Sequence, residues 1–235
     1  MLPLSDGLPA RRFPIITVAL ITANFIVWIF YELPDLDGAV REASFYACDV
    51  DNTCESPQPW AISWFTAMFM HASWDHILGN MLYLAIFGKN VEDAFGRIGF
   101  LLLYVAGGFA ATAMQAAITL GTGSDADAKV PMLGASGAVS AVLGAFLVLY
   151  PFAQIKTLVL IFIVEIPAYI YLGGWFFYQF FEANYALLNP DESGGVAFAA
   201  HVGGFLFGAV AAHLLVKAGR IQAQETPQRT ALSPF

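Results

Sequence analysis

The chain has 235 residues, of which 58% are hydrophobic and only 12% are charged, and its formal net charge is −8. A soluble domain of this length is nearer half apolar and a quarter charged, so this composition excludes an ordinary soluble protein. The sequence has no cluster of basic residues, which excludes a surface for nucleic acid. The hydrophobic residues are concentrated in long runs, and these indicate membrane spans.

Six apolar runs are each near or above the roughly 20 residues that a helix needs to cross the hydrocarbon core. Because lipid offers no partner for backbone N–H and C=O groups, we expect each run to be a helix. The sequence therefore predicts an all-α membrane protein with a bundle of six transmembrane helices in 14–217, an N-terminal segment 1–13 and a C-terminal tail 218–235. The six runs lie at about 14–33, 61–87, 98–120, 131–151, 157–181 and 196–217.

The basic residues between the runs fall mostly on one side of the predicted membrane. If the N-terminus is cytoplasmic, only Arg41 and Lys129 of the 10 Lys and Arg residues lie outside. Cytoplasmic loops are enriched in Lys and Arg, so we predict that both termini are cytoplasmic. Arg11 and Arg12 lead into a run of spanning length with no small-residue cleavage site after it, so we expect no cleavable signal peptide.

Both cysteines of the chain, Cys48 and Cys54, lie in the outer loop at about 34–60. We predict that the protein lies in a bacterial plasma (inner) membrane. An outer loop there faces an oxidising compartment, so we also predict a disulfide between the two cysteines. Two free thiols are the alternative, and the sequence leaves it open.

Polar side chains inside spans are costly, and each is therefore a candidate functional residue. In the second run, His76 and Asn80 are four residues apart and share one helix face, with His71 about one and a half turns nearer the outer surface. The pattern of a zinc protease helix, two His four apart with Glu beside the first, does not occur here. We therefore expect no metal and no cofactor.

Ser136 and His201 lie at similar depths in the fourth and sixth runs. Each is about five residues into a run that enters from outside, roughly 8 Å below the same surface. Asn80 enters from the same side. Histidine can activate serine as a nucleophile and return the proton to the leaving amine, while an amide can stabilise an oxyanion. No carboxylate lies near His201 at that depth, so we predict a Ser-His dyad. Each residue alone could also be a helix start or an interhelical contact.

Rows of small residues follow these two positions. Gly137, Ala141 and Ala145 form one row in the fourth run, and Gly204 and Gly208 form another in the sixth. Such rows allow helix backbones to approach closely, so we predict direct packing of these two spans.

Three motifs together resemble the rhomboid family of intramembrane serine proteases. His71, His76 and Asn80 match its HxxxxHxxxN pattern on the second span. The segment from Gly134 to Gly137 matches GxSG on the fourth, and the segment from Ala200 to Gly208 matches AHxxGxxxG on the sixth. The resemblance covers roughly 60–217, and all three motifs lie in order on the expected spans.

The resemblance implies a rhomboid-like bundle with a water-filled cavity open to the outside, and cleavage of single-span membrane proteins within the lipid bilayer. It implies Ser136 as nucleophile and His201 as general base and acid. It further implies an oxyanion hole from the Ser136 backbone N–H with His76 and Asn80, which His71 supports. Span five would gate entry of the substrate, and Trp175 would be the lateral plug.

The chain departs from well-known bacterial members at two places. Ser140 replaces a tyrosine that stacks on the catalytic histidine, and we expect Phe205 to fill that space. The alternative is that Ser140 simply permits close approach of the helices. No Trp-Arg pair occurs in 34–60. A catalytically inactive rhomboid-like protein that binds clients should lack the serine or the histidine, and both are present. A transporter should show broken helices in two related halves, and Pro167 beside Glu165 is the one such hint.

Overall fold

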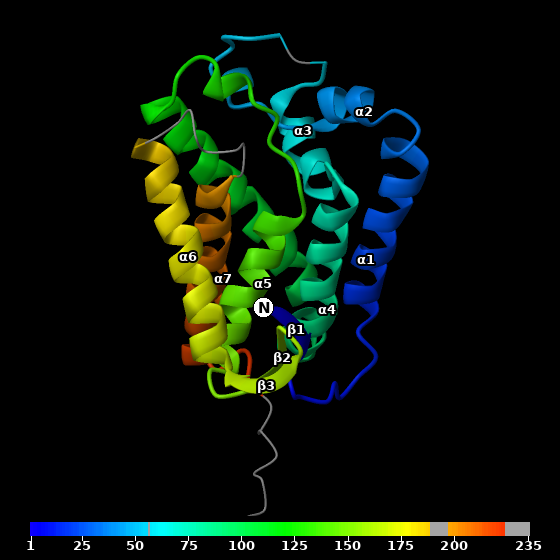
Figure 1. Cartoon of the computed structure of the whole chain (residues 1–235), viewed down its shortest axis with the longest axis vertical. Helices are drawn as coiled ribbons and strands as arrows, with labels where there is room; N and C mark the ends of the chain where they lie inside the picture. The colour runs from blue at the N-terminus through cyan, green and yellow to red at the C-terminus, as the bar shows by residue number, and fades with distance from the viewer. Residues whose placement is uncertain (56, 189–196, 224–235) are drawn as a thin grey trace, which may run out of the picture.

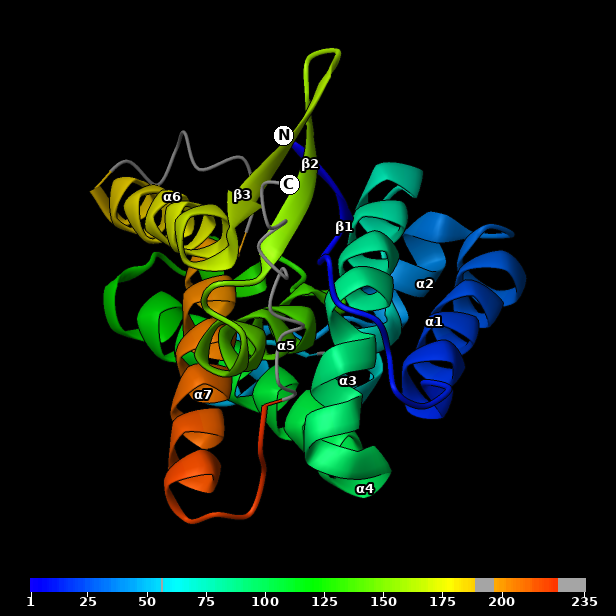
Figure 2. The same cartoon turned by 90° about the horizontal axis from the view of Figure 1, so that it is seen from below.

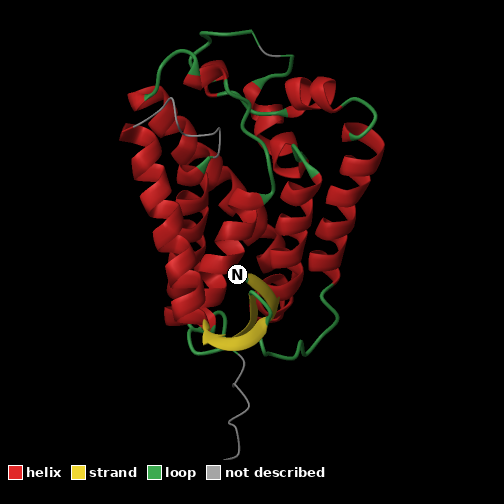
Figure 3. Ribbon diagram, viewed as in Figure 1, coloured by secondary structure: helices red, strands yellow, loops and turns green. Residues whose placement is uncertain are grey.

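The computed structural model describes residues 1–55, 57–188 and 197–223 of the chain, and these are mostly helical (Figures 1 and 3). A small antiparallel sheet lies at one end of the helix bundle, which we call the sheet end. Short helices and loops cover the opposite end, which we call the loop end (Figure 1). The helices are α1 (Ile15–Val27), α2 (Leu36–Ala43), α3 (Trp60–Thr66), α4 (Trp74–Thr122), α5 (Ser136–Leu149), α6 (Ala168–Leu188) and α7 (Phe198–Lys217); the strands are β1 (Leu2–Ser5), β2 (Gln154–Val159) and β3 (Phe162–Pro167).

Three helical segments of the described chain are long and apolar enough to cross a membrane: Ile15–Glu32, Trp74–Thr122 and Phe198–Lys217. The first comprises α1 and a π-helical turn over Trp28–Glu32. The second changes direction at Gly96, where φ is 69° and ψ is 166°. A positive φ is strained for residues with a side chain, so glycine suits this kink. It divides α4 into 74–95 and 97–122, and the second of these parts is close to the predicted third span at 98–120.

Helices α4, α5 and α7 form the centre of the bundle, with α1 packed on α4 and α6 packed on α7 (Figures 1 and 2). The predicted close packing of the fourth and sixth spans is confirmed. Gly204 lies against the backbone carbonyl of Gly137, and Gly208 lies against that of Ala141. A side chain at either glycine would occupy the space of the α5 backbone, so the two helices meet backbone to backbone.

Glu92 joins α1 to α4 near the sheet end. Its buried carboxylate accepts hydrogen bonds from the backbone N–H groups of Ile16 (3.0 Å) and Thr17 (2.8 Å), and from the Thr17 hydroxyl (2.8 Å). A carboxylate at a helix N-terminus also interacts favourably with the helix dipole. Asp6 in the N-terminal segment forms an ion pair with Lys89 of α4 (2.9 Å), so this segment packs on the bundle.

The predicted helix at 157–181 is wrong in its first part. Residues Gln154–Val159 and Phe162–Pro167 form the β2–β3 hairpin, with Lys156 opposite Glu165, and α6 begins only at Ala168. This stretch is rich in β-branched residues, which favour strands, and hydropathy alone does not distinguish an apolar strand from a helix. Glu165 is consequently part of a strand and not a deep residue of a span. The strand order is β1-β2-β3, and Figure 2 shows the hairpin projecting sideways from the bundle.

The predicted second and fourth spans begin too early. Residues 60–69 form α3 and a 3-10 turn, and α4 starts at Trp74, where the Ser73 hydroxyl accepts a hydrogen bond from the His76 N–H (3.2 Å). Helix α5 starts at Ser136, after a loop that descends into the bundle (Figure 1). Pro131 lacks a backbone N–H and Gly134 has a φ of 121°, so neither favours a helix there.

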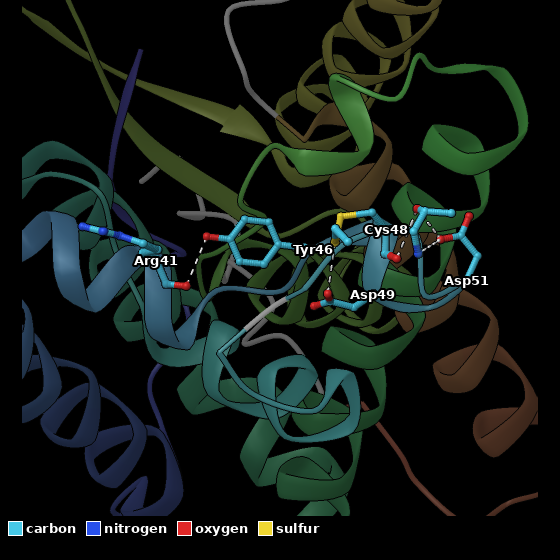
Figure 4. The surroundings of a disulfide bond; sticks show 7 residues. Arg41, Tyr46, Cys48, Asp49 and Asp51 are labelled. Carbon is cyan, nitrogen blue, oxygen red and sulfur yellow. Dashed lines mark hydrogen bonds between the residues drawn. A yellow bond between two sulfur atoms is a disulfide. The ribbon is translucent and has the colours of Figure 1, made fainter.

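The predicted disulfide between Cys48 and Cys54 is confirmed, and Figure 4 shows its surroundings at the loop end. The Tyr46 hydroxyl donates a hydrogen bond to the Arg41 carbonyl oxygen at 3.2 Å. Burial and the nearby Asp49 carboxylate raise the pKa of Tyr46, so its hydroxyl remains a donor at neutral pH. Cys48 is buried in a small apolar cluster with Phe45 and Ala67, and Cys54 packs against it, so the bridge belongs to the packed part of the loop.

Candidate active site

Ser136 is the first residue of α5, and the loop before it places its side chain inside the bundle. The Gly134 N–H donates a hydrogen bond to the carbonyl oxygen of Ala67 at 2.8 Å, which fixes the loop against the 3-10 turn that follows α3. The positive φ of Gly134 turns the chain into α5. Helix α5 has 14 residues, shorter than a full span, so its N-terminus lies below the loop end.

His201 lies in the first turn of α7, and its Nε2 atom is 2.9 Å from Ser136 Oγ. The two residues are 65 positions apart in the chain. They are in contact, as their similar predicted depths imply. Their predicted positions about five residues inside a helix are wrong, because the predicted spans included residues of the preceding loops.

Gln179 on α6 is a functional candidate that the sequence analysis missed. Its Oε1 atom is 2.8 Å from His201 Nδ1, and its side chain is buried. Gln179 therefore occupies the position next to the histidine for which the sequence analysis sought a carboxylate. Gln179 belongs to no recognisable sequence motif. Its spacing from Trp175 and Tyr171, by steps of four residues along α6, was the available signal.

The aromatic neighbours of His201 are Trp175 and, edge-on, Phe198 (centroids 6.5 Å apart), and not the predicted Phe205. The ring centroids of Trp175 and His201 are 6.1 Å apart, and Phe205 instead packs on Trp175 (6.0 Å) and on Phe176 (4.8 Å). The Ser140 hydroxyl donates to the carbonyl oxygen of Ser136 at 2.7 Å. Trp175, predicted as a lateral plug, thus lies directly beside the candidate base.

His76 and Asn80 both line the cavity that contains Ser136. A Cβ on Gly134 would lie 2.8 Å from His76 Nε2 and 3.5 Å from Ser136 Oγ, so His76 and the serine face the same small space. This close approach explains why residue 134 is a glycine, since a side chain there would collide with the His76 ring. The Asn80 Nδ2 group is buried and has no hydrogen-bond partner among the described residues. An unpaired buried donor is unfavourable, so this amide is available to an incoming oxygen.

His71 lies in the turn before α4 and not on the helix, which corrects its predicted position. Its ring packs edge-on against the ring of His76, with centroids 5.0 Å apart. Its backbone N–H donates to the buried carboxylate of Glu32, in the π-helical turn after α1. Glu32 belongs to none of the sequence motifs, yet it connects the end of α1 to the turn that supports His76.

The cavity has a volume of about 590 Å³ and extends from Ser136 to the loop between α4 and α5. Its mouth carries two carboxylates, Asp75 and Asp127. Hydrogen bonds from the backbone and hydroxyl of Ser124 lower the pKa of Asp127, so this residue is charged at neutral pH. The two carboxylates therefore add polar groups to the lining near the loop, while the walls are formed by helices.

The motif residues from His71 to Gly208 all lie within a single match to a family model. The model is that of the Rhomboid domain, and it matches residues 57–218. The chain belongs to the rhomboid family. With its apolar helices, it is an integral membrane protein.

Relatives carry the same family name. The chain is 33% identical over 148 residues to RHOMBOID-like protein 12, mitochondrial, of Arabidopsis thaliana, which covers 57% of this chain and 43% of the relative. It is 33% identical over 146 residues to Presenilin-associated rhomboid-like protein A, mitochondrial, of Danio rerio, and this match covers 60% of this chain and 34% of the relative. It is 31% identical over 169 residues to Rhomboid protein 1, mitochondrial, of Saccharomyces cerevisiae, and this match covers 71% of this chain and 45% of the relative.

The chain thus spans less than half of the length of these three relatives. Their names place them in mitochondria and give no support to the predicted bacterial plasma membrane.

Proposed function

We propose that this protein is an intramembrane serine endopeptidase that cleaves single-span membrane proteins with a Ser136-His201 dyad. The observation that carries the proposal is the 2.9 Å contact between Ser136 Oγ and His201 Nε2 within a cavity of the bundle. Membership of the rhomboid family supports it. The proposal rests on the site itself, since a family can include members with other functions.

In the proposed mechanism, the Ser136 hydroxyl donates its proton to His201 Nε2 and attacks the carbonyl carbon of the scissile peptide. The resulting oxyanion is stabilised by the Ser136 backbone N–H at the start of α5, with His76 and Asn80. His201 then donates the proton to the leaving amine, and the acyl-enzyme forms. Water entering through the polar mouth hydrolyses the ester, and His201 again takes and returns the proton.

The proposed topology has six spans in 14–217, with segments 1–13 and 218–235 in the cytoplasm. The non-helical backbone at Gly96 divides α4 into two helices, which supports two spans in this segment. Lys156 lies in β2, and Lys89 forms an ion pair with Asp6 directly after β1. Both therefore lie at the sheet end, where α7 also ends (Figure 1), and this supports a cytoplasmic location for that end. The predicted tail lies largely in 224–235, outside the described residues.

The proposed function is tested with the purified protein in detergent and a model single-span substrate. We expect cleavage, and we expect a serine-directed fluorophosphonate to label Ser136, located by mass spectrometry of the peptides. Ser136→Ala should lose both the label and the cleavage, while Ser140→Ala should retain the label on Ser136. Binding of the substrate without cleavage or labelling would instead support an inactive client-binding protein.

A further inference from the structure

The contact between Gln179 and His201 bears on how the base is prepared for catalysis, and the inference below rests on the proposed function. His201 has two ring nitrogens, and each has one partner: Ser136 Oγ at Nε2 (2.9 Å) and Gln179 Oε1 at Nδ1 (2.8 Å). An amide oxygen can only accept a hydrogen bond. Nδ1 must therefore carry the hydrogen, which leaves the lone pair of Nε2 directed at the serine hydroxyl.

That tautomer is the one that a general base needs. In Ser-His-Asp triads, a buried carboxylate holds the histidine in this tautomer and orientation. The carboxylates that line the cavity here are Asp75 and Asp127, at its mouth, and His201 hydrogen-bonds to neither within the described residues. We propose that Gln179 is the positioning residue of the dyad: it selects the base tautomer of His201 and fixes its ring.

A neutral amide suits this location for a physical reason. A charged side chain within a span is expensive to bury, whereas an amide needs only its hydrogen bonds. Gln179 is 7% exposed. It can hold the ring without introducing a charge into the bundle, although it stabilises an imidazolium less than a carboxylate would.

Gln179 also links His201 to the position of α6. Tyr171, Trp175 and Gln179 lie four residues apart on one face of this helix. The Tyr171 hydroxyl contacts the Tyr83 hydroxyl of α4 at 2.8 Å, Trp175 packs beside His201, and Gln179 bonds to it. The base is consequently oriented only while α6 is packed in place. A displacement of α6 to admit a substrate would release His201, and closure would restore it.

The test compares Gln179→Met, which keeps the length of the side chain and removes the acceptor, with Gln179→Glu, which restores an acceptor. The matched control is Asn184→Leu. Asn184 is an exposed amide on the same helix, and its side chain bonds to the Phe180 carbonyl oxygen. Thermal melting in detergent checks that each variant is folded.

We expect Gln179→Met to lower kcat by roughly three- to tenfold, the range for loss of one neutral hydrogen bond, with KM unchanged. Gln179→Glu should recover most of kcat and shift the acid limb of its pH–rate profile, and Asn184→Leu should match the wild type. Unchanged kcat in Gln179→Met would overturn the inference.

A second measurement needs no catalysis. Nitrogen-15 NMR of protein labelled only at its 4 histidines reports the tautomer of each ring, and a His201→Gln variant assigns the signal. The wild type should show the Nδ1–H tautomer, and Gln179→Met should show a mixture. A mixture already in the wild type would overturn the inference. If the tautomer is as expected but the wild type neither cleaves nor takes the label, the proposed function fails and the positioning contact stands.

Discussion

The cavity has two unlike walls. On one side, α5 and α7 meet backbone to backbone, with Gly204 and Gly208 set against α5 carbonyl groups. On the other side, α6 presents large exposed apolar side chains such as Phe177 and Phe181, and a Cβ on its Gly173 or Gly174 would meet nothing within 4 Å. The candidate nucleophile and base therefore lie on the tightly packed pair, and the residue that orients the base lies on the loosely packed helix. The reacting groups and the residue that orients them thus lie on helices that differ in how tightly they are packed.

The largest expected effect is on the tightly packed side. Ser136→Ala should abolish cleavage of a single-span substrate with no change in melting temperature beyond a few degrees, because the nucleophile and base act as one unit. On α4, outside this pair of helices, Asn80→Ala should reduce the rate by about 10²–10³, as for loss of one oxyanion donor. Rates are measured by gel densitometry and folding by thermal melting. An Asn80→Ala protein that melts much earlier yet cuts normally would show that Asn80 joins helices and does not act in the reaction.

A matched pair of glycine substitutions tests the packing contrast directly. Gly208→Ala should destabilise the protein by about 1–3 kcal/mol, the usual effect of overpacking, because its Cβ would meet the Ala141 carbonyl. Gly174→Ala should leave stability unchanged or raise it by up to about 1 kcal/mol, since alanine favours helices over glycine. Unfolding in denaturant measures both. Equal destabilisation by the two substitutions would contradict the proposed difference between the walls.

The smallest expected effect comes from the inner contact of α6. Tyr83→Phe removes one partner of the hydroxyl pair with Tyr171, so it should lower stability by about 0.5–1.5 kcal/mol. If α6 is held in place by this contact, hydrogen exchange of its backbone amides should rise while that of α5 stays constant. An equal rise in both helices would mean that the bundle loosens as a whole.

The same contrast explains what the sequence could predict. Ser136, His201 and the small-residue rows lie on the tightly packed pair, where each position accepts few residue types, so the motifs are readable. The predicted start of α5 is wrong because hydropathy cannot distinguish a helix from an apolar loop such as this one, which is held by the hydrogen bond from Gly134 to Ala67. Gln179 was missed because an amide that bonds to a histidine needs no particular neighbours in the sequence.

The hairpin and the role of Glu32 could not be predicted from the sequence for related reasons. Apolar residues at 157–167 satisfied the criterion for a span, but their β-branched composition favoured strands over a helix. Glu32 lies at the end of the first run, where a carboxylate resembles an ordinary interfacial residue. Its burial and its bond to the His71 backbone follow only from the three-dimensional arrangement.

The N-terminal strand also carries a consequence for the order of events during biosynthesis. Leu2 pairs with Leu158 across the β1–β2 ladder, so Leu2 must wait for a partner that is synthesised more than 150 residues later. At translation rates of about 5–20 residues per second, that interval is roughly 8–30 s. During it, α1 and α4 can already associate through Glu92. The strand then closes over the sheet end as a late step, after the helices that it crosses have been assembled.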